Sequence, residues 1–254
     1  MSGHSKWATI KHKKGAADKA RGKLFAKLIR QVEVAAREGG GDPDANPTLR
    51  SMFQKARESS VPIDTIERAI KRGTGELEGV HYEQVSYEGY APSGVAVIIE
   101  CLTDNRNRTG SDIRATFSKS GGSMAEPGAV AWQFERKGLI QVPKAEGGRS
   151  FGEDDVMLPA LEGGADDVRD SGDLWEVVTP ATDLVAVRVA LEGASLPVDS
   201  AELTMLATST VPLSSEGDAR KVLRLVDSLE DLDDVQNVYA NFDIPDAIIE
   251  LVEA

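Results

Sequence analysis

Ten lysine and arginine side chains lie within the first 37 residues of the chain, against two acidic ones, Asp18 and Glu33. This segment carries a net charge of +8, whereas the whole chain has a formal net charge of −13. Such a concentration of cations on an acidic protein favours a polyanionic partner, usually nucleic acid, whose phosphates the cations neutralise. The ten cations are Lys6, Lys11, Lys13, Lys14, Lys19, Arg21, Lys23, Lys27, Arg30 and Arg37.

The first part of this segment, residues 1–15, has polar side chains and glycines without an apolar period, which predicts a flexible arm. Trp7, His4 and His12 place flat rings beside the arm's lysines, an arrangement that suits stacking on unpaired bases. The alternative is a solvated charge run with Trp7 packed onto the core. The contrast in sign with the rest of the chain favours binding.

From about residue 16 a helical period begins. At 100° per residue, four cations fall within a sector of roughly 80°, and apolar side chains occupy the opposite side. We therefore predict that the apolar face packs on the protein while the cations point away from it. Reversing the charge of Lys19, Lys23 and Lys27 would then abolish nucleic-acid binding and leave the fold intact. The four cations are Lys19, Lys23, Lys27 and Arg30, and the apolar set is Leu24, Phe25, Leu28, Ile29, Val32, Ala35 and Ala36.

Two loops further along the chain are also candidates for binding. The polar residues 104–108 follow a continuous apolar run, and loops at the ends of buried strands often carry binding residues. Either Arg106 and Arg108 hold phosphate there, or Asp104 caps the next helix and the arginines pair with acidic side chains. Residues 120–128 are small, and their backbone amides could approach a ligand, but a plain connection is the simpler interpretation.

Residue types that serve most catalytic and metal sites are scarce. Two of the three histidines, His4 and His12, lie on the arm, so a Ser/His/Asp triad has no rigid histidine. The sequence has no GxxxxGK[ST] loop, no GxGxxG after a strand, no HExxH and a single cysteine, Cys101. The acidic residues of the C-terminal half are scattered, as on solvated faces. We predict a protein that is not an enzyme, with no catalytic residues, no metal and no cofactor.

Charge is spread unevenly along the chain. Residues 1–80 hold 16 basic and 10 acidic groups, and residues 81–254 hold 13 and 32. The acidic part repels phosphate, so nucleic acid is expected to bind the N-terminal part. The excess of acidic residues in residues 81–254 could serve either to attract basic proteins or simply to keep the protein in solution. No apolar run approaches the roughly 18 residues of a membrane span, and no signal-peptide pattern is present. With one cysteine, this predicts a cytoplasmic protein without membrane or small-molecule partner.

The periodicities predict an α+β fold with an N-terminal three-helix domain. Helices are expected from about residue 16 to 38, from Pro47 with Asn46 as N-cap, and from Val61-Pro62 to a stop at Gly73. Strands are expected over residues 82–87, 95–102 and 129–134, with a helix after 103–109. A turn at residues 136–138 then leads into a βαββαβ order, which is ferredoxin-like, ending at residue 207.

The last helix, around residues 222–229, and a strand at 235–242 have no partners in that unit. They would complete the sheet begun at residues 95–134. We therefore predict that the three-helix domain is followed by two ferredoxin-like-type α+β domains, and that the third domain of the chain is inserted in the second. The predicted division is 1–80 for the arm and helical domain, 81–135 plus 210–243 for a discontinuous α+β domain, 136–209 for the inserted domain and 244–254 for a tail.

Three stretches closely resemble the YebC/PmpR family: MSGHSKWATIKHKKGAADKARGKLFAKLIR, YEGYAPSGVAVIIECLTDNRNRT and GGSMAEPGAVAWQFERKG. The resemblance extends through DARKVLRLVDSLEDLDDVQNVYANFD and so covers essentially the whole chain, although residues 144–151 follow no family pattern. It implies a three-domain α+β protein. Bacterial members are commonly described as cytoplasmic DNA-binding transcriptional regulators, a mitochondrial relative is a translational activator, and bacterial members have also been linked to ribosomes.

Two functions therefore stay open: a DNA-binding transcriptional regulator, and a translation factor that binds ribosomal RNA or the ribosome. Cationic contacts alone give salt-dependent and weakly specific binding, and no predicted helix has a clear base-reading set. The resemblance implies that the basic residues of the arm and first helix face nucleic acid. The predicted nucleic-acid-binding residues are Lys6, Trp7, Lys11, His12, Lys13, Lys14, Lys19, Arg21, Lys23, Lys27, Arg30, Arg106 and Arg108.

Overall fold

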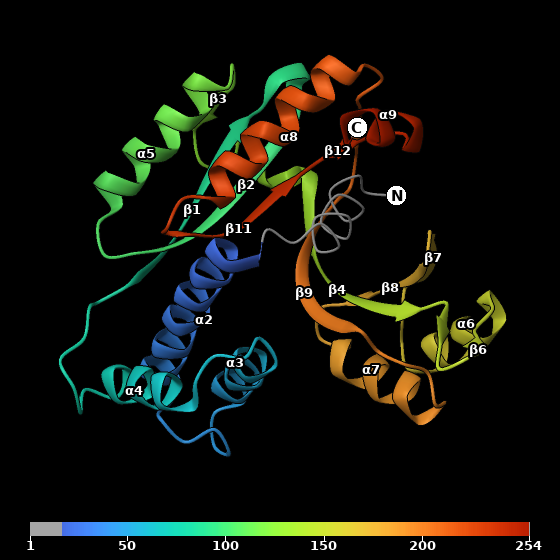
Figure 1. The fold of residues 1–254 in the computed structure, drawn as a ribbon, viewed down its shortest axis with the longest axis horizontal. Helices are drawn as coiled ribbons and strands as arrows, with labels where there is room; N and C mark the ends of the chain where they lie inside the picture. The colour runs from blue at the N-terminus through green and yellow to red at the C-terminus, as the bar shows by residue number, and fades with distance from the viewer. Residues whose placement is uncertain (1–16, 254) are drawn as a thin grey trace.

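The computed structural model describes residues 17–253, including all of their side chains except those of 17–21, 246 and 253 (Figure 1). Part of the predicted binding set lies outside this description. Lys6, Trp7, Lys11, His12, Lys13 and Lys14 precede the described residues, and the side chains of Lys19 and Arg21 fall outside them as well.

The N-terminal part of the described chain is a three-helix domain, as predicted. It contains α2 (Ala17–Gly39), α3 (Pro47–Glu58) and α4 (Ile63–Gly73). Asn46 is the N-cap of α3, where its side chain accepts a hydrogen bond from the Leu49 amide at 3.0 Å. Proline fits at the next position because its missing N–H has no partner in the first helical turn. The apolar stripes of the three helices meet in one core, which includes Leu28, Val32 and Ile66.

Gly73 ends α4 as predicted, but for a different physical reason. A side chain at Gly73 would meet the Glu33 carbonyl oxygen and, at 2.7 Å, the Ala36 Cβ atom of α2. The glycine is therefore required by the close approach of the two helices. The residue with left-handed backbone after α4 is Gly75, with φ of 82°.

The first sheet combines distant parts of the chain. Its antiparallel order is β11 (Val235–Ala240), β2 (Ala96–Thr103), β1 (Glu83–Tyr90) and β3 (Ser123–Ala125). Helices α5 (Arg106–Lys119) and α8 (Glu216–Glu230) lie side by side over one face (Figure 1). Since strand side chains alternate, Val97 and Ile99 pack under these helices, whereas Ala96 and Ile98 face the opposite side.

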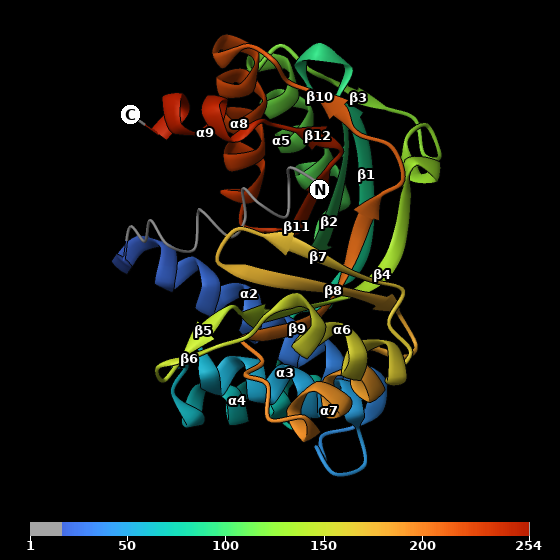
Figure 2. The same ribbon diagram turned by 90° about the vertical axis from the view of Figure 1, so that its right-hand side faces the viewer.

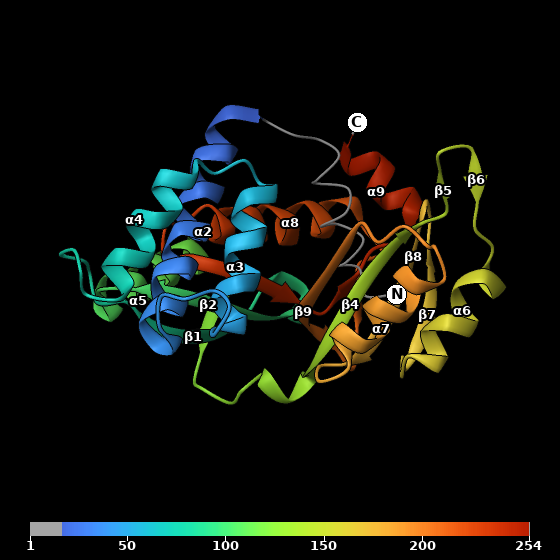
Figure 3. The same cartoon turned by 90° about the horizontal axis from the view of Figure 1, so that it is seen from below.

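The second sheet is antiparallel, in the order β7 (Asp167–Ser171), β8 (Leu174–Pro180), β4 (Phe134–Pro143) and β9 (Ser200–Ala207). Helices α6 (Glu153–Glu162) and α7 (Leu184–Gly193) pack on it and on each other (Figure 3). The chain order is βαββαβ, so the predicted ferredoxin-like arrangement and the α+β class are confirmed.

The two sheets are joined where β4 begins and β9 ends. Phe134, Met205 and Ala207 pack against Ile98 and Tyr239 on the free face of the first sheet. The pairing of β11 with β2, across more than a hundred residues, supports the division into a discontinuous domain and an inserted one. The boundaries of that division stay a proposal.

The prediction of a strand at residues 129–134 was wrong. Ala131–Gln133 is a short 3-10 helix, and Trp132, which strand alternation would place on the same inward side as Val130 and Phe134, is 72% exposed. The buried Glu88 carboxylate accepts hydrogen bonds from the amides of Gly128, Val130 and Ala131 at 2.7–3.0 Å, which holds this segment in a loop. The predicted turn at residues 136–138 is also wrong, because β8 and β9 pair with β4 on both sides there and keep it extended.

Several short elements were not predicted. β1 continues past residue 87, where the predicted strand ended, to Tyr90. Residues 144–151 contain a small hairpin of β5 (Ala145–Glu146) and β6 (Arg149–Ser150). β10 (Val211–Pro212) pairs in parallel with β12 (Phe242–Asp243), and the predicted tail contains α9 (Asp246–Glu253), whose Ile249 is buried.

Candidate nucleic-acid interface

The cationic side of α2 lies against the connection between α8 and β11. This connection, residues 230–234, has four acidic residues in five and is called the acidic turn below. Lys23 Nζ donates to the Asp231 carboxylate at 2.8 Å and to its carbonyl at 3.0 Å. Lys27 Nζ donates to the Glu230 carbonyl at 3.0 Å. Two cations one helical turn apart thus bind the end of α8. Figure 2 shows the lower end of α8 above α2.

Arg30 extends the same line of contacts. Its Nη1 donates to the Asp233 carbonyl at 2.6 Å and to the Asp234 carboxylate at 3.0 Å. The guanidinium carbon also lies 5.4 Å from the centre of the Tyr82 ring, a distance at which a cation is attracted to an aromatic face. The neighbouring Gln31 amide donates to the Gln236 side chain at 3.3 Å.

The cations lie on a different side of α2 from its apolar face, as predicted, but that side is not free. The apolar face packs on α3 and α4, whereas Lys23, Lys27 and Arg30 bind another part of the same chain. Charge reversal at these positions would disturb this internal contact as well as any ligand. Whether the three side chains bind nucleic acid stays a prediction.

Asp234 is the centre of a buried hydrogen-bond network and is only 7% exposed. One carboxylate oxygen accepts the bond from Arg30, and the other accepts bonds from Arg108 at 2.8 Å and Thr109 at 2.7 Å. Thr103 donates to the same oxygen at 3.3 Å. The carboxylate therefore connects α2, the end of β2, the start of α5 and the start of β11.

Electrostatics at Asp234 favour its charged form. Burial raises the pKa of the carboxyl, but hydrogen bonds from Arg108 and Thr109 and the charges of Arg108 and Arg30 outweigh burial and hold the pKa below its ordinary value. Since the carboxylate accepts several donors while ionised, it acts as a structural anion that holds the two arginines in place.

Arg106 and Arg108, the two other predicted phosphate ligands, have different environments. Arg108 donates to Asp104 at 2.7 Å as well as to Asp234, so of the two alternatives its pairing with acids is the one observed. Arg106 is exposed, with its guanidinium 3.8 Å from the Glu83 carboxylate. The cap of α5 is Asn105 rather than Asp104, since the Asn105 side chain accepts the Arg108 amide at 3.1 Å.

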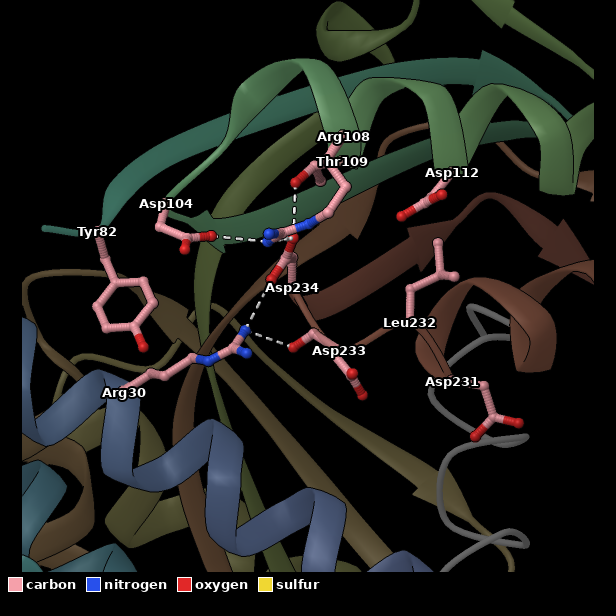
Figure 4. A pocket seen from close by; sticks show the side chains of 10 residues that line it. All are labelled: Arg30, Tyr82, Asp104, Arg108, Thr109, Asp112, Asp231, Leu232, Asp233 and Asp234. Atoms are coloured by element: carbon pink, nitrogen blue, oxygen red, sulfur yellow. Dashed lines mark hydrogen bonds and ion pairs between the residues drawn. The ribbon is translucent and has the colours of Figure 1, made fainter. Parts of the chain in front are cut away.

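An open cavity of about 520 Å³ lies between α2, the start of α5 and the acidic turn (Figure 4). Five of its side chains are carboxylates and two are guanidinium groups, and both guanidinium groups already bind Asp234. The cavity is therefore net acidic and unsuited to phosphate. It is lined by Arg30, Tyr82, Asp104, Arg108, Thr109, Asp112, Asp231, Leu232, Asp233 and Asp234.

Sequence reasoning missed the acidic turn, Asp234 and Tyr82. A signal for the turn was present, because Glu230, Asp231, Asp233 and Asp234 form the densest acidic run near the end of the chain. Its position opposite α2 had no sequence signal, since about two hundred residues separate the two.

Within residues 17–253, no three or more His, Cys, Asp or Glu side chains are grouped so that they could hold a metal ion. Nor does any helix in that range have the length and apolar character needed to cross a membrane.

Family models match most of the chain. The TACO1/YebC N-terminal domain matches residues 5–76, and the TACO1/YebC second and third domain matches residues 82–242. The chain belongs to the TACO1/YebC family. Its N-terminal match ends after α4 and the second begins at β1, so the family's division agrees with the break between the helical domain and the first sheet.

Curated relatives of this TACO1/YebC chain are similar over its full length. A probable transcriptional regulatory protein of Thermobifida fusca is 59% identical over 250 residues, covering 98% of each chain. A protein of the same description from Streptomyces avermitilis is 56% identical over 255 residues, covering 100% of each. The crystal structure of a conserved hypothetical protein from Aquifex aeolicus has a TM-score of 0.80 and 46% identity, covering 90% of this chain and 93% of that one.

Proposed function

We propose that this TACO1/YebC family member is a non-enzymatic regulator of gene expression that binds nucleic acid and acts in the cytoplasm. The observation that carries the proposal is the charge contrast: ten cations against two acids within the first 37 residues of a chain of net charge −13. Its relatives are named probable transcriptional regulatory proteins, which supports a role in gene regulation.

The structure of α2 supports the same proposal. Lys23, Lys27 and Arg30 form one line of cations whose partners are carboxylate and carbonyl oxygens. Phosphate oxygens offer the same kind of acceptor at similar distances. In the sequence, further cations precede these three: Lys19 and Arg21, whose side chains are not described, and Lys6, Lys11, Lys13 and Lys14, which lie before the described residues.

Salt-dependent binding tests the proposal directly. We expect the triple variant Lys11→Glu, Lys13→Glu and Lys14→Glu to bind a short duplex DNA and a single-stranded RNA at least about tenfold more weakly. Each lost phosphate contact lowers the slope of log affinity against log salt by about 0.9 for duplex and about 0.7 for single strands, so the slope should fall by about 2–3.

A matched control reverses three exposed cations elsewhere, Arg114, Lys119 and Arg136, to glutamate. It has the same net charge as the arm variant, so only the position of the lost charge differs. Equal losses in both variants would mean that net charge alone governs binding, and unchanged affinity in the arm variant would contradict the proposal.

The type of nucleic acid is decided by crosslinking in living cells, with parallel recovery of bound RNA and DNA. Discrete DNA sites near promoters, with RNA at background, would assign the protein to transcription. Strong crosslinks to ribosomal RNA with little DNA would assign it to translation instead.

A further inference from the structure

The contacts between α2 and the acidic turn resemble those between a basic helix and a phosphate backbone. Three cations spaced along one helix face bind oxygens of a short acidic segment, through Asp231, Glu230 and the Asp233–Asp234 pair. A second cavity of about 260 Å³, lined in part by Lys23, Lys27 and Asp233, lies beside these bonds.

The helical domain is attached to the rest of the described chain by polar contacts. Its apolar cluster contains no residue beyond Ile70, and the described residues of the other clusters all lie at Tyr87 or later. Outside the α2 contacts, an exposed pair of Lys55 with Glu202 also reaches across. Residues 74–81, which link α4 to β1, are exposed. No shared apolar core therefore has to break if α2 leaves the turn.

The α2 contacts become more exposed toward the N-terminal end of the helix. Counting side-chain atoms alone, Arg30 is 21% exposed and its partner Asp234 is 9% exposed, whereas Lys23 is 32% exposed and its partner Asp231 is 75% exposed. Exposed ion pairs contribute little to stability, and salt screens them. A polyanion of high charge density can therefore compete with the turn at Lys23 and Lys27 first, while Arg30 and Asp234 are better protected.

We propose that the acidic turn is an internal phosphate substitute that covers the cations of α2 and is displaced when nucleic acid binds. This rests on the proposed function, because the displacing ligand is the nucleic acid assigned there. The turn then makes binding selective for dense, extended polyanions, since a weak or isolated anion does not outcompete carboxylates held on the same chain. Binding and release of α2 are coupled: whatever weakens the covered state strengthens binding.

The experiment removes carboxylates from the turn and leaves Asp234 in place. The double variant Asp231→Asn and Asp233→Asn takes two negative charges from beside Lys23, Lys27 and Arg30. The control, Asp154→Asn and Glu162→Gln, takes two from exposed positions on α6 in the inserted domain. Affinity for a short single-stranded RNA and a duplex DNA is measured at low salt.

We expect the turn variant to bind about fivefold more tightly than the control, because it loses the exposed Lys23–Asp231 ion pair and one further negative charge that compete with phosphate. If wild type binds and both variants bind alike, the inference is overturned and the proposed function stands. If neither wild type nor variant binds either nucleic acid, both are overturned. Binding by the turn variant alone would support the inference in its strongest form.

A second measurement uses the wild-type protein and so does not depend on how a variant folds. Amide hydrogen exchange across residues 230–236 is compared with and without saturating single-stranded RNA. Faster exchange in this segment on RNA binding is expected, because α2 no longer covers it. Unchanged or slower exchange there, with binding confirmed in the same sample, would overturn the inference.

Discussion

Replacing Asp234 by asparagine tests whether one buried carboxylate joins four elements of the fold. The amide has the same shape, but it lacks the charge that accepts bonds from Arg30, Arg108 and Thr109. Hydrogen bonds to charged groups contribute about 1.5–3 kcal/mol each in protected sites. Because the Arg108 side chain is 48% exposed and water can solvate it, we discount its share. The expected loss is about 2–3 kcal/mol in the free energy of unfolding.

Thermal and urea unfolding, followed by circular dichroism, measure this loss. For a chain of this size, about 2–3 kcal/mol corresponds to a fall in Tm of roughly 4–12 °C. The control is Asp233→Asn, an exposed neighbour whose substitution should change stability by less than about 0.5 kcal/mol. A loss at Asp234 no larger than at Asp233 would refute the reasoning that this carboxylate is a structural anion.

The pH dependence gives an independent check with a definite sign. The pKa of Asp234 is lower in the folded protein than its ordinary value of about 3.9, so the unfolded chain takes up the proton first as pH falls. The stabilisation is fully present above about pH 4 and is lost as pH falls through the lower folded pKa. The stability difference between wild type and the asparagine variant should therefore be constant near neutrality and shrink below about pH 4.

Two further predictions concern packing. Gly73→Ala should destabilise the helical domain by about 1–3 kcal/mol, because the new methyl group meets α2. Gly22→Ala, where no atom lies within 4 Å of the new methyl group, should stabilise the domain by up to about 1 kcal/mol. Equal effects of the two variants in thermal unfolding would contradict this reasoning. The second prediction concerns the Cys101 thiol, whose pKa is raised to about 12, first by burial and then by the charge of Asp234. Because the thiolate is the reactive form, labelling by a thiol reagent at pH 8 should be slow in the folded protein and fast in urea. Rapid labelling under native conditions would show that β2 is not packed as described.

Local patterns predicted most of the secondary structure of this chain. Asn46-Pro47, the apolar stripes of the three helices and the long apolar run of β2 each have a short-range physical cause, and each was located correctly. The βαββαβ order was also readable, because strands and helices there alternate with clear periods. The fold class follows from these patterns.

The errors have one common cause, which is contact between residues distant in sequence. Residues 129–134 have the alternation of a strand, but the Glu88 carboxylate accepts hydrogen bonds from the amides of Val130, Ala131 and the preceding Gly128, which fixes a loop. The Arg-Lys-Gly stretch at 136–138 has the composition of a turn, but pairing with β8 and β9 keeps it extended. Neither competing partner is visible in a local window.

The amino-acid sequence by itself determined where the cations are and that one side of α2 is apolar and the other basic. Helical geometry makes that separation a local property. Only the tertiary structure decided what lies opposite the basic side: the return of the chain through α8 into β11 places the acidic turn beside Lys23, Lys27 and Arg30. The basic side of α2, which the sequence alone suggests is free, is therefore an internal contact. The pairing of β11 with β2 fixes the position of the acidic turn that it binds.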